Sequence, residues 1–265
     1  MALALLAAEQ PKTVALSELP STVQKTIQAQ VGDGKLGKIE RVEEDGEVTY
    51  EAEMTKGGTD RGFCVAEGGT LLSVEVMLEE TPVAVRKTIE KQVGQSTLDR
   101  IDKTFDNGQA SYDVEMTTKH GADRSFSVAA DGKLQRMQVT FEELPAAVRK
   151  TVEDQVSKAR LGDIFRTFDD EDVFYDVEMT CDGKCRDFSV AENGKLESKE
   201  VFLSELPPAA RRTIKERIGN GKLFRIDEVF VRRQGVFPYE VEGRKDGKPF
   251  NFSVGPKGRF LGMDD

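Results

Sequence analysis

A tandem repeat is the feature that most constrains the fold of this chain. Four segments of similar sequence each begin at a proline, at intervals of 62, 63 and 62 residues: Pro20, Pro82, Pro145 and Pro207. This period is longer than the roughly 20–50 residues of common solenoid repeats, so each copy is expected to be a small domain. We therefore expect an N-terminal segment at residues 1–16, followed by repeat units at 17–79, 80–142, 143–204 and 205–265.

Each copy is expected to begin with one helix. In "ELPSTVQKTIQAQV", Val23, Ile27 and Val31 are spaced four residues apart and share one helical face. Proline suits the first helical turn because the N–H group that it lacks would have no partner there. Gly32 follows the apolar face and is expected to end the helix, since glycine adopts the left-handed conformation at low cost.

Four extended segments are expected after each helix, separated by turn pairs such as Asp182-Gly183 and Asn193-Gly194. In "VTYEAEM", Tyr50, Ala52 and Met54 alternate with acidic residues, which predicts a strand with one face toward the helix and one toward solvent. The expected fold class is α+β, with tandem units of one helix packed on a four-stranded antiparallel meander. One face of each sheet would then stay open.

The repeated motifs also carry a resemblance to a known family. "ELPSTVQKTI", "VTYEAEM" and the closing "AADGKL" or "AENGKL" recur in the same order over residues 17–265. With four tandem copies of these motifs, the chain resembles the PepSY-like family, whose members include proteins likened to β-lactamase inhibitors. The resemblance implies an extracytoplasmic bacterial protein, with protein binding over the open sheet face in the inhibitor-like relatives. No inhibitory loop of that family matches residue by residue, so inhibition itself is not implied.

Charge and the N-terminal segment bear on partners and location. The chain has 48 acidic and 38 basic residues, a net charge of −10, and this disfavours nucleic acid as a partner. The apolar run in "MALALLAAEQP" is too short for membrane insertion. It is similar to the end of a secretory signal, with residues 1–8 as a remnant; the alternative is an ordinary chain terminus. We expect a periplasmic or secreted protein.

No cofactor or metal site is expected. Gly32, Gly34 and Gly37 match the G-x-G-x-x-G spacing, but a helix precedes them and a strand follows, the reverse of what a phosphate site requires. The later copies lack this spacing. The single histidine, His120, has no Cys or second His near it in sequence to complete a zinc site.

Acidic residues on the expected solvent face of the second strand form the candidate binding site. They recur in the first three copies: Glu51, Glu53, Asp113, Glu115, Asp176 and Glu178. Recurrence in several copies argues against an acid–base catalytic pair, so an enzyme is not expected. The carboxylates either attract a basic protein partner or keep an open sheet soluble. The expected function is non-enzymatic binding of a protein, as an inhibitor or regulator; the alternative is a small-ligand sensor with a site between units.

Two cysteines flank a tight turn in "CDGKC". Cys181 and Cys185 are expected to meet across the hairpin as a disulfide, which would support export, because reducing cytosol rarely keeps one. A metal pair is the rival interpretation, but no further Cys or His lies nearby in sequence. Cys64 takes a position that serine holds in the other copies and is expected to be a free thiol.

Overall fold

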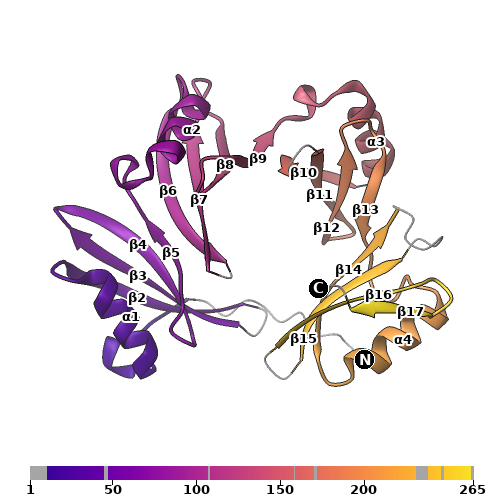
Figure 1. Ribbon diagram of the computed structural model, residues 1–265, viewed down its shortest axis with the longest axis horizontal. Helices are drawn as coiled ribbons and strands as arrows, with labels where there is room; N and C mark the ends of the chain where they lie inside the picture. The colour runs from indigo at the N-terminus through magenta and orange to yellow at the C-terminus, as the bar shows by residue number, and fades with distance from the viewer. Residues whose placement is uncertain are drawn as a thin grey trace. The chain divides into compact units, whose positions relative to one another are not determined.

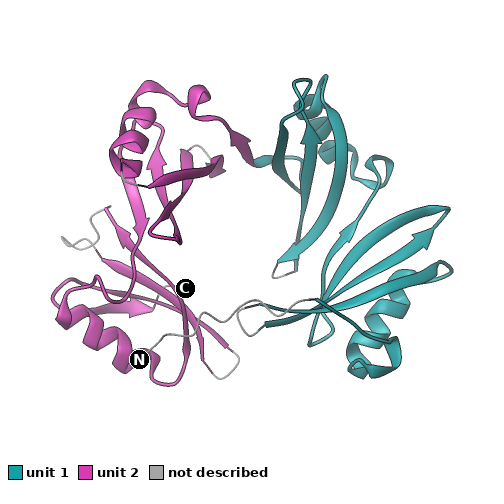
Figure 2. Cartoon of the chain, turned by 180° about the vertical axis from the view of Figure 1, so that it is seen from behind, with its two compact units in different colours: residues 1–135 teal, residues 136–265 magenta. Residues whose placement is uncertain are grey.

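The computed structural model describes residues 11–44, 47–106, 108–157, 159–169, 172–230, 238–245 and 248–263. The chain divides into two compact units, residues 1–135 and 136–265 (Figures 1 and 2). The predicted signal remnant at residues 1–8 lies outside the described residues. Within the described ranges there are 17 strands and four α-helices.

Unit 1 opens with a short strand and then alternates between helices and groups of strands. Its elements are β1 (Lys12–Thr13), α1 (Ser21–Val31), β2 (Lys35–Glu44), β3 (Glu47–Lys56), β4 (Thr59–Ala66), β5 (Leu71–Glu75), α2 (Val83–Val93), β6 (Thr97–Asp106), β7 (Gln109–Thr117) and β8 (Asp123–Ala129). Antiparallel pairing runs through each consecutive pair of these strands, from β1 with β2 to β7 with β8.

Unit 2 follows the same order of elements and ends with one further strand. They are β9 (Leu134–Val139), α3 (Ala146–Val156), β10 (Arg160–Asp169), β11 (Asp172–Cys181), β12 (Lys184–Ala191), β13 (Leu196–Glu200), α4 (Pro208–Ile218), β14 (Lys222–Val229), β15 (Tyr239–Lys245), β16 (Lys248–Val254) and β17 (Phe260–Met263). Consecutive strands from β9 to β17 again pair antiparallel.

The ends of α1 lie where the sequence predicted them. The helix begins directly after Pro20, whose φ of −54° suits a helix start. It ends at Gly32, which has a φ of +56° and donates its N–H group to the carbonyl oxygen of Gln28 at 3.0 Å. The predicted helix-ending role of Gly32 is confirmed, and this glycine closes a helix rather than opening one.

A glutamate supports the turn that precedes each of α2 and α4. Glu80 accepts the N–H group of Met77 at 2.8 Å and Nη1 of Arg61 at 2.7 Å. In unit 2, Glu205 accepts the N–H group of Phe202 at 2.7 Å and both terminal nitrogens of Arg186, at 3.0 and 2.8 Å. These contacts join the strand that carries the arginine to the start of the next helix.

The core lies between the helices and one face of the strands. Val23 and Ile27 of α1 are completely buried against Phe63 of β4 and the apolar side of β3. Burying one such side chain stabilises the fold by roughly 1.5–3 kcal/mol. Equivalent clusters form beneath α3 and α4. The predicted alternation along β3 is confirmed, because Tyr50, Ala52 and Met54 are buried while the glutamates between them are exposed.

The predicted fold class is wrong in treating each copy as a separate α+β unit with its own four-stranded meander. The described chain is mainly antiparallel sheet, and the strands of neighbouring copies pair: β5 with β6 in unit 1 and β13 with β14 in unit 2. An edge strand carries backbone N–H and C=O groups without partners, and pairing with the next copy satisfies them. Pairing is continuous within each compact unit, and unit 2 also includes most of β9, from the second copy, which pairs with β10. The residue boundaries proposed for the four repeats stay a prediction.

Candidate functional site

The sheet face opposite the helices carries the six acidic residues singled out in the sequence. In unit 1, Glu51 and Glu53 on β3 and Asp113 and Glu115 on β7 are exposed. In unit 2, Glu178 on β11 is exposed. Asp176 is half-buried and accepts a hydrogen bond of 2.6 Å from Oγ1 of Thr167.

Strand pairing determines which of these carboxylates share a surface. From β3 the pairing continues through β4, β5 and β6 to β7, so the two acidic pairs of unit 1 lie on the same face of one sheet. With strands spaced about 4.8 Å apart, β3 and β7 are separated by about 19 Å. The face of unit 1 that carries Glu51, Glu53, Asp113 and Glu115 is called the open face below.

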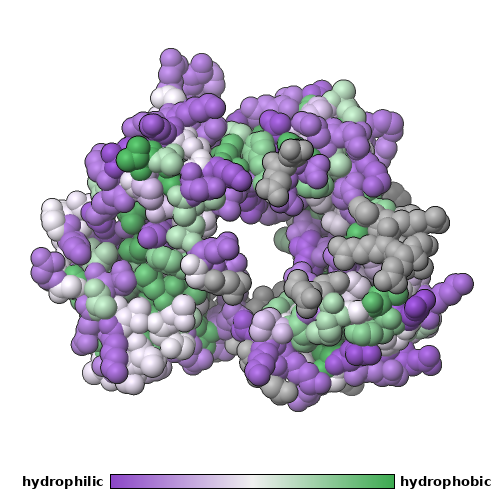
Figure 3. Space-filling view, in the orientation of Figure 1, coloured by the Kyte–Doolittle hydropathy of each residue, from purple (hydrophilic) through white to green (hydrophobic). Residues whose placement is uncertain are grey.

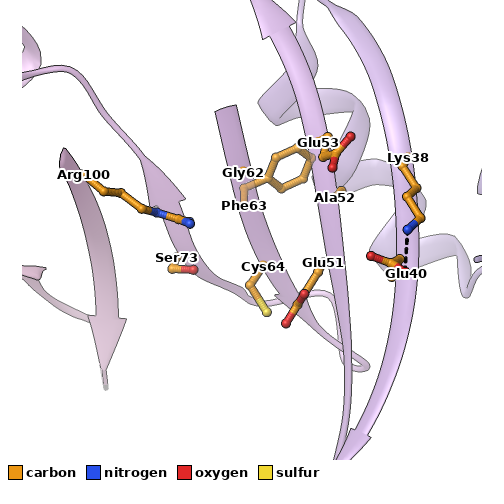
Figure 4. Close-up of a pocket in the computed structure, with 10 residues that line it drawn as sticks. All are labelled: Lys38, Glu40, Glu51, Ala52, Glu53, Gly62, Phe63, Cys64, Ser73 and Arg100. Carbon is orange, nitrogen blue, oxygen red and sulfur yellow. Dashed lines mark ion pairs between the residues drawn. The ribbon is translucent and has the colours of Figure 1, made fainter. Parts of the chain in front are cut away.

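A hollow of about 320 Å³ lies on the open face (Figure 4). Five neighbouring strands, β2 to β6, supply its lining: Lys38, Glu40, Glu51, Ala52, Glu53, Gly62, Phe63, Cys64, Ser73 and Arg100. Lys38 Nζ and Glu40 Oε1 form an ion pair at 2.7 Å. A second hollow of about 480 Å³ adjoins it and shares three of its lining residues, Glu53, Gly62 and Arg100.

Arg100 lines this hollow but was not singled out in the sequence, and the same is true of Lys38, Glu40 and Gly62. Arg100 projects from β6, and its Nε and Nη2 atoms lie 2.6 and 2.9 Å from the carboxylate oxygens of Asp102. Glu75 on β5 lies 4.0 Å from Nε. The hydrogen bond with Asp102 raises the pKa of Arg100. Its guanidinium, like that of any arginine, is positively charged.

Unit 2 has a counterpart to this arginine, 125 residues later. Arg225 on β14 binds Asp227 on its own strand and Asp187 on β12. Burial lowers the pKa of Arg225, but the hydrogen bonds with the two aspartates outweigh it and the pKa is raised. Burial and the charge of Asp187 raise the pKa of nearby Glu200. The recurrence of an arginine in "DRID" and "FRID" was the sequence signal for this cluster.

The predicted disulfide is absent, because Cys181 and Cys185 are both free thiols. The hairpin has a two-residue turn, so Cys181 pairs with Lys184 while Cys185 pairs with Thr180. Side chains alternate between faces along a strand, and this pairing places the two cysteines on opposite faces of the sheet. Cys64 is a free thiol, as expected, and burial raises its pKa.

Among the described residues, no group of three or more His, Cys, Asp or Glu side chains is arranged to hold a metal ion. None of the helices in the described ranges has both the length and the apolar character needed to cross a bilayer. His120 is exposed beyond the end of β7.

No family model matches this sequence, and no curated protein matches it. Several solved structures are similar to part of the chain. A DUF2874 family protein from Bacteroides ovatus is 16% identical, with a TM-score of 0.35, over 46% of this chain and 86% of that one. A BLIP-like protein from Bacteroides fragilis has the same identity, TM-score and shares of each chain. A protein from Bacteroides thetaiotaomicron, proposed to be periplasmic and calcium-regulated, is 17% identical, with a TM-score of 0.31, over 47% of this chain and 93% of that one.

These likenesses are distant. The BLIP-like description agrees with the inhibitor-like relatives named from the sequence motifs, while none of the three structures is described as PepSY. At TM-scores of 0.31–0.35 they carry no argument about how this chain works.

Proposed function

We propose that this protein is a non-enzymatic, periplasmic or secreted binding protein that engages another protein through the open face. The observation that carries the proposal is a polar, hollowed sheet surface with exposed carboxylates on two strands, β3 and β7. Antiparallel sheets often leave one face to solvent, and a wide polar face can serve as a recognition surface. A periplasmic or secreted location agrees with the description of one similar structure as a proposed periplasmic protein.

The charge of the open face indicates the kind of partner. Lys38 and Arg100 each pair with a neighbouring carboxylate, while Glu51 and Glu53 add negative charge to the same hollow. Hydrophilic side chains are spread over the visible surface of both units, with hydrophobic residues between them (Figure 3). A mainly basic partner surface would complement this face, and attraction between the two would speed association at low ionic strength.

A charge-reversal experiment tests this proposal. The variant Glu53→Lys/Glu115→Lys reverses two charges on the open face, and Glu67→Lys/Glu90→Lys reverses two exposed charges on the β4–β5 turn and on α2. Both variants change the net charge equally. Each protein is used to capture partners from an envelope extract of the source organism, and the recovered proteins are identified by mass spectrometry.

The expected result is a partner that binds the wild type and the control variant Glu67→Lys/Glu90→Lys. The same partner should not bind the open-face variant Glu53→Lys/Glu115→Lys. Its association rate with the wild type, measured with the purified partner, should fall as salt is added. Circular dichroism confirms that each variant is folded. Equal recovery by both variants would show that the carboxylates only keep the sheet soluble, and the proposal would then be wrong.

The alternative of a small-ligand sensor receives less support. The hollow of about 320 Å³ lies within the size range of ligand sites. However, such sites are lined mainly by apolar side chains, and charged residues supply much of this lining. A thermal-shift screen with metabolites and metal ions distinguishes the two functions, because a ligand that binds only the folded state raises Tm.

A further inference from the structure

Each unit has its own arginine cluster, and the two clusters differ at one position. Arg100 in unit 1 and Arg225 in unit 2 both lie on the strand that pairs with the preceding copy. Each has an aspartate two residues later on the same strand, Asp102 or Asp227, and a glutamate on the adjacent strand, Glu75 or Glu200. The remaining neighbour differs, because unit 2 has Asp187 where unit 1 has Gly62, 125 residues earlier.

In unit 2, Asp187 completes the coordination of the arginine. Its Oδ2 accepts a hydrogen bond of 2.7 Å from Nη1 of Arg225, and its Oδ1 accepts a second one from Nη2. A carboxylate that accepts hydrogen bonds from both terminal nitrogens of a guanidinium forms a bidentate pair, which is stronger and more specific than a single hydrogen bond. The Arg225 side chain is 34% exposed.

In unit 1, the same place has no side chain. A Cβ atom built on Gly62 would lie 3.4 Å from Nη2 of Arg100 and 3.9 Å from Oε2 of Glu75. Gly62 and Arg100 both line the hollow of about 320 Å³, and Figure 4 shows Arg100 reaching from β6 toward the strands that carry Ser73 and Gly62. The Arg100 side chain is 44% exposed, more than that of Arg225.

We propose that the hollow beside Gly62 receives the carboxylate of an aspartate or glutamate side chain from a protein partner, which pairs with Arg100 as Asp187 pairs with Arg225. This inference rests on the proposed function and specifies one contact within it. The partner surface would present one acidic side chain to Arg100 and basic side chains to Glu51 and Glu53.

The acidic surroundings of Arg100 do not exclude a further carboxylate. Arg225 has equivalent acidic neighbours, Asp227 and Glu200, and still binds Asp187. In unit 2 a residue of the protein itself, Asp187, completes the arrangement around the arginine. In unit 1 a carboxylate from another molecule would complete it. The inference also assigns the contact to unit 1 alone, since Asp187 already occupies the corresponding place in unit 2.

Nuclear magnetic resonance of the arginine Nε–Hε groups tests the contact directly. The probes are N-acetyl-aspartate N-methylamide and its asparagine analogue, added to the whole protein at constant ionic strength. We expect the aspartate probe to shift the Arg100 signal saturably, with an affinity about tenfold above that of the asparagine probe, which corresponds to about 1.4 kcal/mol. The Arg225 signal should stay in place.

Exchanging the two differing residues gives the reciprocal control. Gly62→Asp should supply the carboxylate internally and abolish the response of Arg100, while Asp187→Gly should create a response at Arg225. An Arg100 signal that responds equally to both probes, or that still responds in Gly62→Asp, would overturn the inference. If Asp187→Gly fails to fold, the wild-type and Gly62→Asp titrations decide the matter.

The outcome is separable from that of the proposed function. A natural partner that requires Glu53 and Glu115 but binds Gly62→Asp as tightly as the wild type would leave the proposed function standing and refute the arginine contact. A partner that binds Gly62→Asp at least about tenfold more weakly, a loss of about 1.4 kcal/mol, would support both.

Discussion

Thr26 Oγ1 on α1 donates a hydrogen bond of 2.6 Å to the carbonyl oxygen of Gly69, 43 residues later in the turn between β4 and β5. The same contact recurs in the other copies: Thr88 with Gly132 at 2.6 Å, Thr151 with Gly194 at 2.6 Å, and Thr213 with Gly258 at 2.8 Å. It ties each helix to the turn between the third and fourth strands that follow it. The recurring threonine of the helix and the recurring glycine of the turn are therefore the donor and the acceptor of one recurring hydrogen bond.

The first prediction concerns the threonine. Thr151→Val keeps the shape of the side chain but removes the donor, leaving the partly buried carbonyl of Gly194 without it. We expect the free energy of unfolding to fall by about 1 kcal/mol, measured by urea denaturation. Thr151→Ser retains the hydroxyl and should lose less. Equal losses in both variants would indicate that packing, rather than the hydrogen bond, accounts for the effect.

The second prediction concerns the glycine. Gly194 has a φ of +84°, and a Cβ there would lie 2.6 Å from the carbonyl oxygen of Ala147 on α3. Gly183 has a similar φ of +75°, but a Cβ there would have no atom within 4 Å. Alanine at either position costs backbone strain, and only Gly194→Ala adds a steric clash. The free energy of unfolding of Gly194→Ala should therefore be lower than that of Gly183→Ala by roughly 1–3 kcal/mol, the cost of overpacking. Matching denaturation midpoints would argue against this close approach of helix and turn.

The third prediction concerns pH. Burial, together with the charge of Asp187, raises the pKa of Glu200, so the folded state favours its protonated form. The stability that this preference provides is present below the ordinary glutamate pKa and is lost as pH rises through the folded value. Glu200→Gln should therefore have a higher Tm than the wild type at pH 7, with the difference shrinking toward pH 4. Glu216→Gln, on the exposed side of α4, is the control. A Tm difference that is independent of pH would contradict the assignment.

The fourth prediction concerns the thiols. Cys181 and Cys185 lie on opposite faces of their hairpin, so unreduced protein should be alkylated by iodoacetamide at all three cysteines. Exposed Cys185 should react fastest, and half-buried Cys64 slowest, because burial raises its thiol pKa. Peptide mass spectrometry over time gives the three rates. Protection of both hairpin cysteines until a reductant is added would show that the strand pairing differs from the one described.

Local patterns in the sequence were sufficient to predict the elements that depend on neighbouring residues. The four-residue spacing of Val23, Ile27 and Val31 located α1, and Gly32 marked its end. Alternation in "VTYEAEM" separated the buried side chains from Glu51 and Glu53. These features follow from the helical period of 3.6 residues and the strand period of 2 residues. Both periods can be recognised within one short segment, without knowledge of the rest of the fold.

The tertiary structure alone decided how the copies combine and which side chains meet. The sequence does not show that β5 pairs with β6, because the hydrogen bonds between strands are made by backbone groups that every residue type except proline provides. That pairing brings Arg100 of one copy beside Gly62 of the preceding copy and creates the hollow of the open face. The disulfide prediction failed for a similar reason, because the register of the hairpin could not be predicted from the sequence. A shift of one residue in strand pairing reverses the face on which each side chain lies.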